Sequence, residues 1–200
     1  AVYVGCGGHR TSAGGPWYIA KWLEAFGSPR LYTSPPIDSP SLIIAYDRLF
    51  GGPLPLGVFD IEHADCALFV ATNPVVSHHW TMPQSNPFTR LKKALNRGMK
   101  LVVIDPRKCD VAERAHVHLQ VKPGEDASLL ACLIREIIEN KWYDAEYVNH
   151  YVSGFDELYE AVKPFTLQYT EHRTTCAAAD IVEAARIFAT AKSGAAASGT

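Results

Sequence analysis

The chain has 200 residues, of which 48% are hydrophobic and 20% charged, with a formal net charge of −2. This length suits one domain or parts of two, and the composition predicts a packed core rather than a disordered chain. The near-neutral charge provides no basic field for nucleic acid, so an anion site would need local groups. No segment approaches the roughly 20 apolar residues of a membrane span.

The cysteines are widely spaced and never form a C-x-x-C pair. An odd, scattered set predicts reduced thiols rather than a disulfide framework or a zinc knuckle. No signal peptide is visible, and the sequence does not distinguish the cytoplasm from the periplasm. The five positions are Cys6, Cys66, Cys109, Cys132 and Cys176.

Residues 1–60 are expected to form part of an α/β domain that precedes the main one. The chain opens with a short buried strand and a glycine-rich loop. Apolar positions at helical spacing predict one helix from Pro16 to Gly27 and a second from Pro40 to Gly51. The proline-rich stretch between the two helices is predicted to be irregular.

Residues 61–200 are expected to form a Rossmann-like domain. Buried strands are predicted at 66–72 and 100–104, and period-two alternation predicts a third strand at 116–121. Strands that alternate with helices favour an α/β fold with a mostly parallel sheet flanked by helices. Asp126 and Asp144 are predicted to cap helices. The predicted helices span residues 86–97, 127–140, 145–152, 154–162 and 178–192.

Polar stretches follow all three of these strands. They are TNPVVSHH at residues 72–79, DPRK at residues 105–108 and KPGED at residues 122–126. The carboxyl ends of parallel strands lie at the same edge of a sheet, and ligands of open α/β sheets bind outside that edge. We therefore expect the three stretches to lie together and to form a site.

The side chains of these stretches suit a cofactor that carries a nucleotide. Asp105 is placed like the acidic residue that binds ribose hydroxyls in dinucleotide folds, and Arg107 can meet phosphates with its fork of donors. Asp126 can accept two N–H bonds from guanine, and Asn73 offers both a donor and an acceptor. Gly124 lets the backbone approach a ring closely.

Each stretch also has a purely structural interpretation. Asp105 before its proline can be a strand stop, Asn73 before its proline an ordinary turn, and Asp126 only a helix cap. No G-x-G-x-x-G follows any predicted strand, so the usual NAD fingerprint is missing. The coincidence of three such stretches at consecutive strand ends favours a site.

The ordered motifs resemble the molybdopterin oxidoreductase family of the dimethyl sulfoxide reductase type, which carries molybdenum or tungsten on two molybdopterin guanine dinucleotides. The central domain of that family shows G-x-N-P-x-x-S-H, then D-P-R, then P-G-S/T-D/N. The matching segments are residues 71–78, 105–107 and 123–126. Ala71 stands where the family has glycine, and Glu125 where it has serine or threonine.

The resemblance implies that this chain holds the guanosine end of one pterin cofactor. The implied cofactor-binding positions are Thr72, Asn73, Ser77, His78, Asp105, Arg107, Gly124 and Asp126. Many family members also bind the metal through a side chain after a GSPN turn, and counting along the pattern places Asp38 there. A carboxylate suits a hard, high-valent metal, although the alternative is that Asp38 caps the following helix.

Both ends of the sequence look cut, so we expect a fragment that is not active alone. The resemblance implies a molybdenum or tungsten oxidoreductase that carries out two-electron redox of a small substrate. A 4Fe–4S cluster would belong to a missing upstream segment, because closely spaced cysteines are absent here. The implied partners are the remainder of the catalytic chain and an iron–sulfur electron-transfer subunit, and no nucleic acid.

Two other interpretations stay open at this stage. One is a metal-free structural or electron-transfer subunit of the same fold, which metal analysis of the full-length protein would distinguish. The other is a plain nucleotide-binding α/β module, which predicts that this chain binds a free nucleotide by itself.

Overall fold

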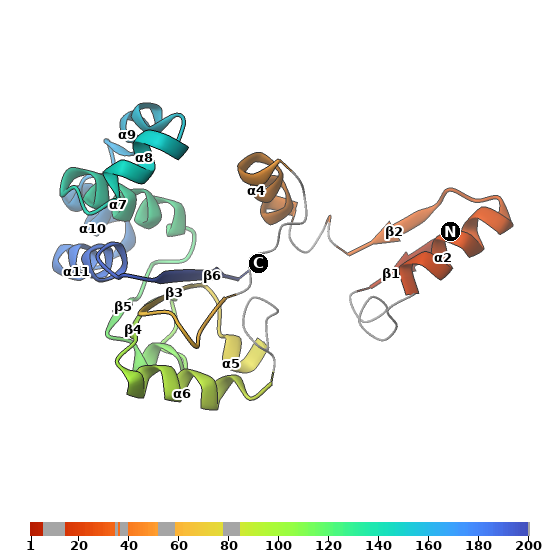
Figure 1. Cartoon of the computed structure of the whole chain (residues 1–200), viewed down its shortest axis with the longest axis horizontal. Coiled ribbons are helices and arrows are strands. Elements are labelled where there is room, and N and C mark those ends of the chain that lie inside the picture. Colours follow the sequence, from red (N-terminus) through yellow and green to blue (C-terminus); the bar gives the residue numbers. More distant parts are fainter. Residues whose placement is uncertain (6–14, 35, 37–39, 52–58, 78–84, 200) are drawn as a thin grey trace. The chain divides into compact units, whose positions relative to one another are not determined.

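The structure, a computed structural model, divides the chain into two compact units that comprise residues 1–56 and 57–199. Figure 1 shows the course of the chain and its helices and strands. Each unit is described separately below. The described residues are 1–5, 15–34, 36, 40–51, 59–77 and 85–199.

The first unit contains a β–α–β arrangement. The strands β1 (Val2–Val4) and β2 (Leu31–Thr33) pair in parallel, and helix α2 (Gly15–Phe26) lies between them in sequence. Helix α4 (Pro40–Phe50) follows. The prediction of an irregular stretch was wrong for β2, because parallel pairing with β1, a contact between segments distant in sequence, makes residues 31–33 a strand.

The second unit is built on a four-stranded sheet with the order β5-β4-β3-β6. All its strand pairs are parallel, so the predicted fold class, an α/β domain with a parallel sheet flanked by helices, is confirmed. The strands are β3 (Cys66–Val70), β4 (Lys100–Ile104), β5 (Val117–Leu119) and β6 (Gly194–Ser198).

Helices cover both faces of this sheet. Figure 1 shows α5 and α6 on one side of the strands and the helices from α7 to α11 on the other. The helices are α5 (Pro74–Ser77), α6 (Pro87–Arg97), α7 (Asp126–Glu139), α8 (Ala145–Tyr151), α9 (Phe155–Val162), α10 (Leu167–Thr174) and α11 (Ala178–Ala189), and a 3-10 turn spans Ala112–Arg114.

The central strand β4 explains why the sheet needs two covering layers. Leu101 and Val103 pack into the core on the α6 side, together with Leu91. Val102 and Ile104 pack into the other core, which includes residues of α7 and α11. The four buried positions of β4, residues 101–104, are therefore all apolar rather than alternating, as expected for a parallel sheet.

Two predicted helix caps have different outcomes. Asp144 caps α8, since its carboxylate accepts the backbone N–H of Tyr147 at 2.9 Å. The prediction that Asp126 caps α7 was wrong: Asp126 is the first helical residue, and Glu125 holds the cap position without a side-chain cap bond. The carboxylate of Asp126 is therefore not consumed by its own helix.

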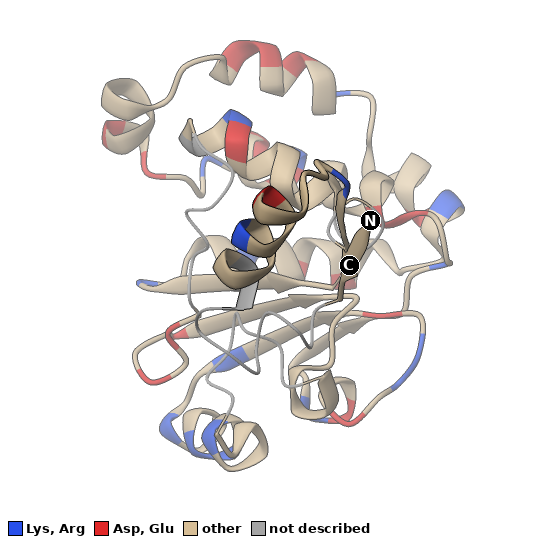
Figure 2. Ribbon diagram, turned by 90° about the vertical axis from the view of Figure 1, so that its right-hand side faces the viewer, with Lys and Arg blue, Asp and Glu red and all other residues tan. Residues whose placement is uncertain are grey.

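Charges of both signs are spread along the ribbon (Figure 2). Helix α6 is an exception, because all its charged residues are basic: Arg90, Lys92, Lys93 and Arg97. Arg90 pairs with Glu62, and the Arg97 guanidinium donates to the carbonyl oxygens of residues 61 and 64 at 3.0 and 3.1 Å. Two of these cations thus fasten α6 to the segment before β3.

None of the helices in the described part of the chain combines the length and the apolar character that a membrane crossing requires.

The described cysteines are free and buried, and burial raises the pKa of the Cys66 thiol to about 11. Because the thiolate is the reactive form, we expect iodoacetamide to alkylate Cys66 roughly 100-fold more slowly in the folded chain than in denaturant. Peptide mass spectrometry after timed quenching measures the two rates. Alkylation of Cys66 in the native chain at the rate of a free thiol would contradict this burial.

Candidate functional site

Three connections leave one edge of the sheet. They follow β3, β4 and β5 and contain residues 71–77, 105–108 and 120–126. Since β3 pairs with β4 and β4 with β5, all in parallel, the carboxyl ends of the three strands lie side by side. The structure thus brings the three polar stretches of the sequence to the edge where open α/β sheets bind their ligands.

The connection after β3 contains an unpaired buried oxygen. The main-chain oxygen of Asn73 accepts the N–H of Ser77 at 2.9 Å and the Ser77 hydroxyl at 3.1 Å, which starts α5. The side-chain Oδ1 of Asn73 is buried and has no hydrogen-bond partner among the described residues. An unpaired buried acceptor costs about 1–3 kcal/mol, so this atom suits a ligand that donates to it.

The neighbours of Asn73 contribute less to a site. Thr72 is 6% exposed and forms part of the packed strand end. The hydroxyl of Ser77 is engaged within α5, which leaves it poorly suited to bind a ligand. Ala71 adopts a left-handed φ of 48°, which accounts for the glycine that the family motif has at this position.

The connection after β4 is organised by Asp105. Its Oδ1 accepts the backbone N–H of Arg107 at 2.7 Å, and its Oδ2 faces only the weak donor Cys109 Sγ at 3.8 Å. Asp105 therefore does shape the strand stop, as its structural interpretation predicts. It retains a half-buried oxygen that can accept from a hydroxyl, and the exposed Arg107 guanidinium has no partner within the described ranges.

The connection after β5 presents Gly124 and Asp126. Gly124 has a φ of 91°, and a Cβ added there would meet no atom within 4 Å. This conformation favours glycine and leaves the backbone open on that side. The carboxylate of Asp126 is half-buried, stands in the first turn of α7 and forms no hydrogen bond or ion pair with any described residue.

Glu125 ties this connection to α10. The Arg173 guanidinium donates to both oxygens of the Glu125 carboxylate, at 2.7 and 3.1 Å, and the Ser128 hydroxyl donates at 2.8 Å. The backbone N–H of Lys122 also donates to the Thr174 carbonyl at 2.9 Å. This clamp between Glu125 and Arg173 cannot be recognised in the sequence, because the two partners lie 48 positions apart and no local pattern links them.

The clamp predicts a pH dependence of stability. The bond from Arg173 lowers the pKa of the Glu125 carboxyl below its ordinary value of 4.5. The stabilisation is complete above that value and is lost as the pH falls through the folded-state pKa. We therefore expect the melting temperature of Glu125→Gln to fall less than that of the wild type on acidification below about pH 4.5. Parallel acid curves for the two proteins, measured by differential scanning fluorimetry, would contradict the clamp.

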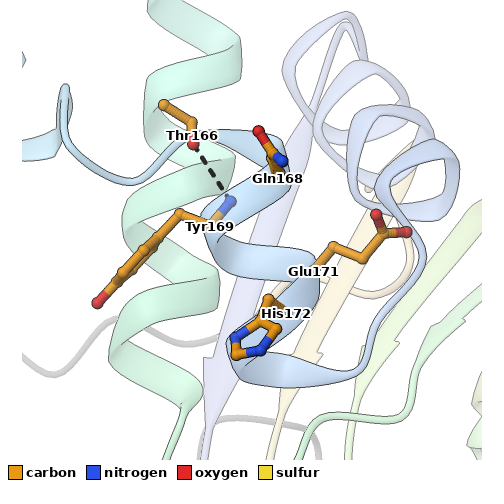
Figure 3. Close-up of a pocket in the computed structure, with 5 residues that line it drawn as sticks. All are labelled: Thr166, Gln168, Tyr169, Glu171 and His172. Atoms are coloured by element: carbon orange, nitrogen blue, oxygen red, sulfur yellow. Dashed lines mark hydrogen bonds between the residues drawn. The ribbon is translucent and has the colours of Figure 1, made fainter.

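A shallow hollow occurs on α10, away from the strand ends in sequence. It is lined by Thr166, Gln168, Tyr169, Glu171 and His172, all from one helix and the residue before it (Figure 3). The Thr166 hydroxyl oxygen accepts the N–H of Tyr169 at 3.2 Å, and Glu171 accepts the N–H of Ala178 at 2.8 Å. Two of its polar side chains are thus bonded to backbone N–H groups, and all its lining residues belong to α10 or directly precede it rather than lying at a strand end, so the hollow is not the candidate site.

Asp38 and His78 lie outside the described residues. Among the residues that are described, no group of three or more His, Cys, Asp and Glu side chains is arranged to hold a metal ion.

The fold and the strand-end groups define a class of protein. A parallel α/β sheet with amide, carboxylate and guanidinium groups at adjacent strand ends belongs to the open α/β class, whose ligands bind at that edge. The profile of the family described as "Molybdopterin oxidoreductase" matches residues 18–194. The chain belongs to this molybdopterin oxidoreductase family.

Individual relatives agree with this assignment. The chain is 40% identical over 127 residues to acetylene hydratase of Syntrophotalea acetylenica. The aligned segment covers 64% of this chain and 17% of that protein. It is 30% identical over 156 residues to formate dehydrogenase H of Escherichia coli. This aligned segment covers 78% of this chain and 21% of that protein. The chain thus spans about a fifth of the length of these relatives.

A solved structure supports the fold. Acetylene hydratase from Pelobacter acetylenicus superimposes with a TM-score of 0.76 and 30% sequence identity. The match covers 90% of this chain and 24% of that structure.

Proposed function

We propose that this chain binds the guanosine end of a molybdopterin guanine dinucleotide in an enzyme that carries out two-electron redox of a small substrate. The observation that supports the proposal most is the buried, unpaired Oδ1 of Asn73 at the same sheet edge as Asp105 and Asp126. A ligand rich in N–H and O–H donors would satisfy that oxygen and both carboxylates.

Each group has a proposed role in holding the cofactor. Asp126 accepts paired N–H bonds from guanine, Asp105 accepts a ribose hydroxyl, and Arg107 meets a phosphate. Asn73 pairs with the nucleoside, and Gly124 lets the backbone approach the base. When bound, the cofactor and its molybdenum or tungsten supply the two-electron chemistry, while this chain binds and orients the nucleotide end.

The domain roles follow from this assignment. Residues 61–200 are the Rossmann-like domain that binds the guanine dinucleotide. Residues 1–60 are part of a preceding α/β domain, with Asp38 as the proposed metal ligand.

For the whole protein we propose a small substrate, with formate as the first to test because of the relative named formate dehydrogenase H. A 4Fe–4S cluster would lie in a segment upstream of this chain, and an iron–sulfur subunit would accept the electrons. A second candidate reaction is hydration of a small unsaturated substrate, because the relative named acetylene hydratase shares 40% identity. Assays of formate oxidation and acetylene hydration on the full-length enzyme separate the two.

The cofactor proposal is tested with Asp105→Asn and Asp126→Asn in the full-length enzyme. These changes preserve side-chain size, and the amide oxygen introduced by Asp105→Asn can still accept the Arg107 N–H, so the fold should persist. Loss of hydrogen bonds to a charged acceptor is worth about 1.5–3 kcal/mol, or roughly 10- to 100-fold in affinity. We therefore expect both variants to contain less molybdenum or tungsten and to release less GMP on acid hydrolysis.

The control is Asp156→Asn, which changes an exposed carboxylate in the first turn of α9. It should retain the cofactor of the wild type. Wild-type metal and GMP content in both Asp105→Asn and Asp126→Asn would reject the proposed site.

A further inference from the structure

Two side chains, one in β5 and one just after it, form hydrogen bonds with the connection after β4. His118 lies in the strand, and Gln120 follows it two residues later, on the same face of the sheet. The His118 Nε2 lies 2.9 Å from the Asp105 carbonyl oxygen, and the Gln120 side-chain amide donates to the Pro106 carbonyl oxygen at 3.0 Å. The carbonyl groups of Asp105 and Pro106 are thus bonded to His118 in β5 and to Gln120 just after it.

The chemistry of these contacts fixes their direction. A carbonyl oxygen can only accept, so Nε2 of His118 must carry the hydrogen. The backbone N–H of Asp105 also donates to the Leu119 carbonyl at 3.2 Å, which continues the pairing of β4 with β5. The peptide units on both sides of the Asp105 side chain are therefore bonded to β5.

The carboxylate of Asp105 is held from the other side. Its Oδ1 accepts the backbone N–H of Arg107 at 2.7 Å. This bond orients the carboxylate toward the residues that follow it in the same connection. With the carbonyls fixed by β5 and one carboxylate oxygen fixed by Arg107, the second oxygen, Oδ2, has a defined position. Its one described contact is the weak donor Cys109 Sγ.

We propose that His118 and Gln120 are positioning residues, which set the orientation of the Asp105 carboxylate and so the affinity for the ribose of a guanine nucleotide. This inference rests on the proposed function of Asp105. Without the two donors, the carbonyls would bond to water and the turn would have to be ordered on binding. Pre-organisation of this kind increases affinity by lowering the ordering cost.

The test uses the full-length enzyme, purified without cofactor, and GDP as the probe. His118→Phe and Gln120→Leu preserve bulk but remove the donor, whereas His118→Gln restores an amide donor. Since one hydrogen bond is worth about 1 kcal/mol, we expect each donor-free variant to bind GDP roughly 5-fold more weakly in calorimetry. His118→Gln should bind GDP more tightly than His118→Phe.

A second measurement reports the turn itself. Hydrogen exchange of the Arg107 amide should become faster in both donor-free variants, because the acceptor Asp105 is then less well held. The matched controls are His172→Phe and Gln168→Leu, the same substitutions at exposed positions of α10. Both controls should leave the GDP affinity and the exchange of Arg107 unchanged.

The outcomes separate this inference from the proposed function. If Asp105→Asn weakens GDP binding but His118→Phe and Gln120→Leu do not, the positioning role is overturned and the proposed function stands. Equal losses in His118→Phe and His118→Gln would also overturn it, since packing rather than the donor would then matter. If the full-length wild-type enzyme without cofactor does not bind GDP, the proposed function and the inference that depends on it both fail.

Discussion

Replacing Phe69 by alanine is expected to destabilise the second unit by about 3–5 kcal/mol, the range for large aromatic residues removed from a core. Phe69 is 0% exposed, lies on β3 between β4 and β6, and packs against Phe59 with ring centroids 5.5 Å apart. Its removal leaves a cavity that neighbouring strands cannot fill without breaking their pairing. Urea unfolding followed by circular dichroism measures the free energy of unfolding of both proteins.

The matched control for this substitution is Phe88→Ala. Phe88 is 41% exposed, and the Arg114 guanidinium lies 5.1 Å from the centre of its ring. A surface contact of this kind is worth about 0.5–1 kcal/mol, so the control should be several-fold milder. A Phe69→Ala protein as stable as the control would mean that this face of β3 is not packed as described.

The central sheet could be predicted from the sequence where the hydrophobic pattern and the turn residues indicate the same element. The run from Lys100 to Ile104 is rich in β-branched residues and ends at Asp-Pro, and the structure confirms a strand with these bounds. Gly98, the residue after the predicted helix 86–97, adopts a left-handed φ of 106° at the end of α6. Hydrophobic pattern and turn residues indicate the same boundaries here, which makes such segments predictable.

The segments that sequence reasoning missed depend on contacts distant in sequence. Strand β6 consists of glycine, alanine and serine, which have little strand propensity, and it exists because β3 offers an edge to pair with. Helix α10 was also missed, although Thr166 caps it, because its residues show only weak apolar periodicity. Tertiary pairing and packing decide these elements, and no local window of sequence contains that information.

The candidate site, like the fold, could be predicted from the sequence only where local patterns determine it. The strand ends could be predicted from the positions of Asn73, Asp105 and Asp126, since each follows a recognisable strand. The unpaired state of Asn73 Oδ1 and the bonds from His118 and Gln120 could not, because they depend on the register between neighbouring strands. A one-residue change of register would turn His118 to the opposite face of the sheet.

Replacing Gly199 by alanine is expected to destabilise the second unit by about 1–3 kcal/mol, as for other overpacked positions. Gly199 follows β6, and its N–H donates to the Val70 carbonyl at 2.8 Å. A Cβ there would lie far inside van der Waals contact with the Ala71 carbonyl oxygen and 3.0 Å from the Ala71 carbonyl carbon. Because this contact is with backbone, the end of β6 must move away. Urea unfolding measures the loss.

Ala71, the residue that Gly199 approaches, provides a control of opposite sign. A left-handed alanine costs about 1–2 kcal/mol, and glycine loses about 0.5–1 kcal/mol more backbone entropy on folding. Ala71→Gly should therefore be up to about 1 kcal/mol more stable than the wild type.

If the close approach also sets the position of Asn73, two residues after Ala71, Gly199→Ala should weaken GDP binding while Ala71→Gly should not. Unchanged stability in Gly199→Ala would show that β6 does not approach β3 this closely.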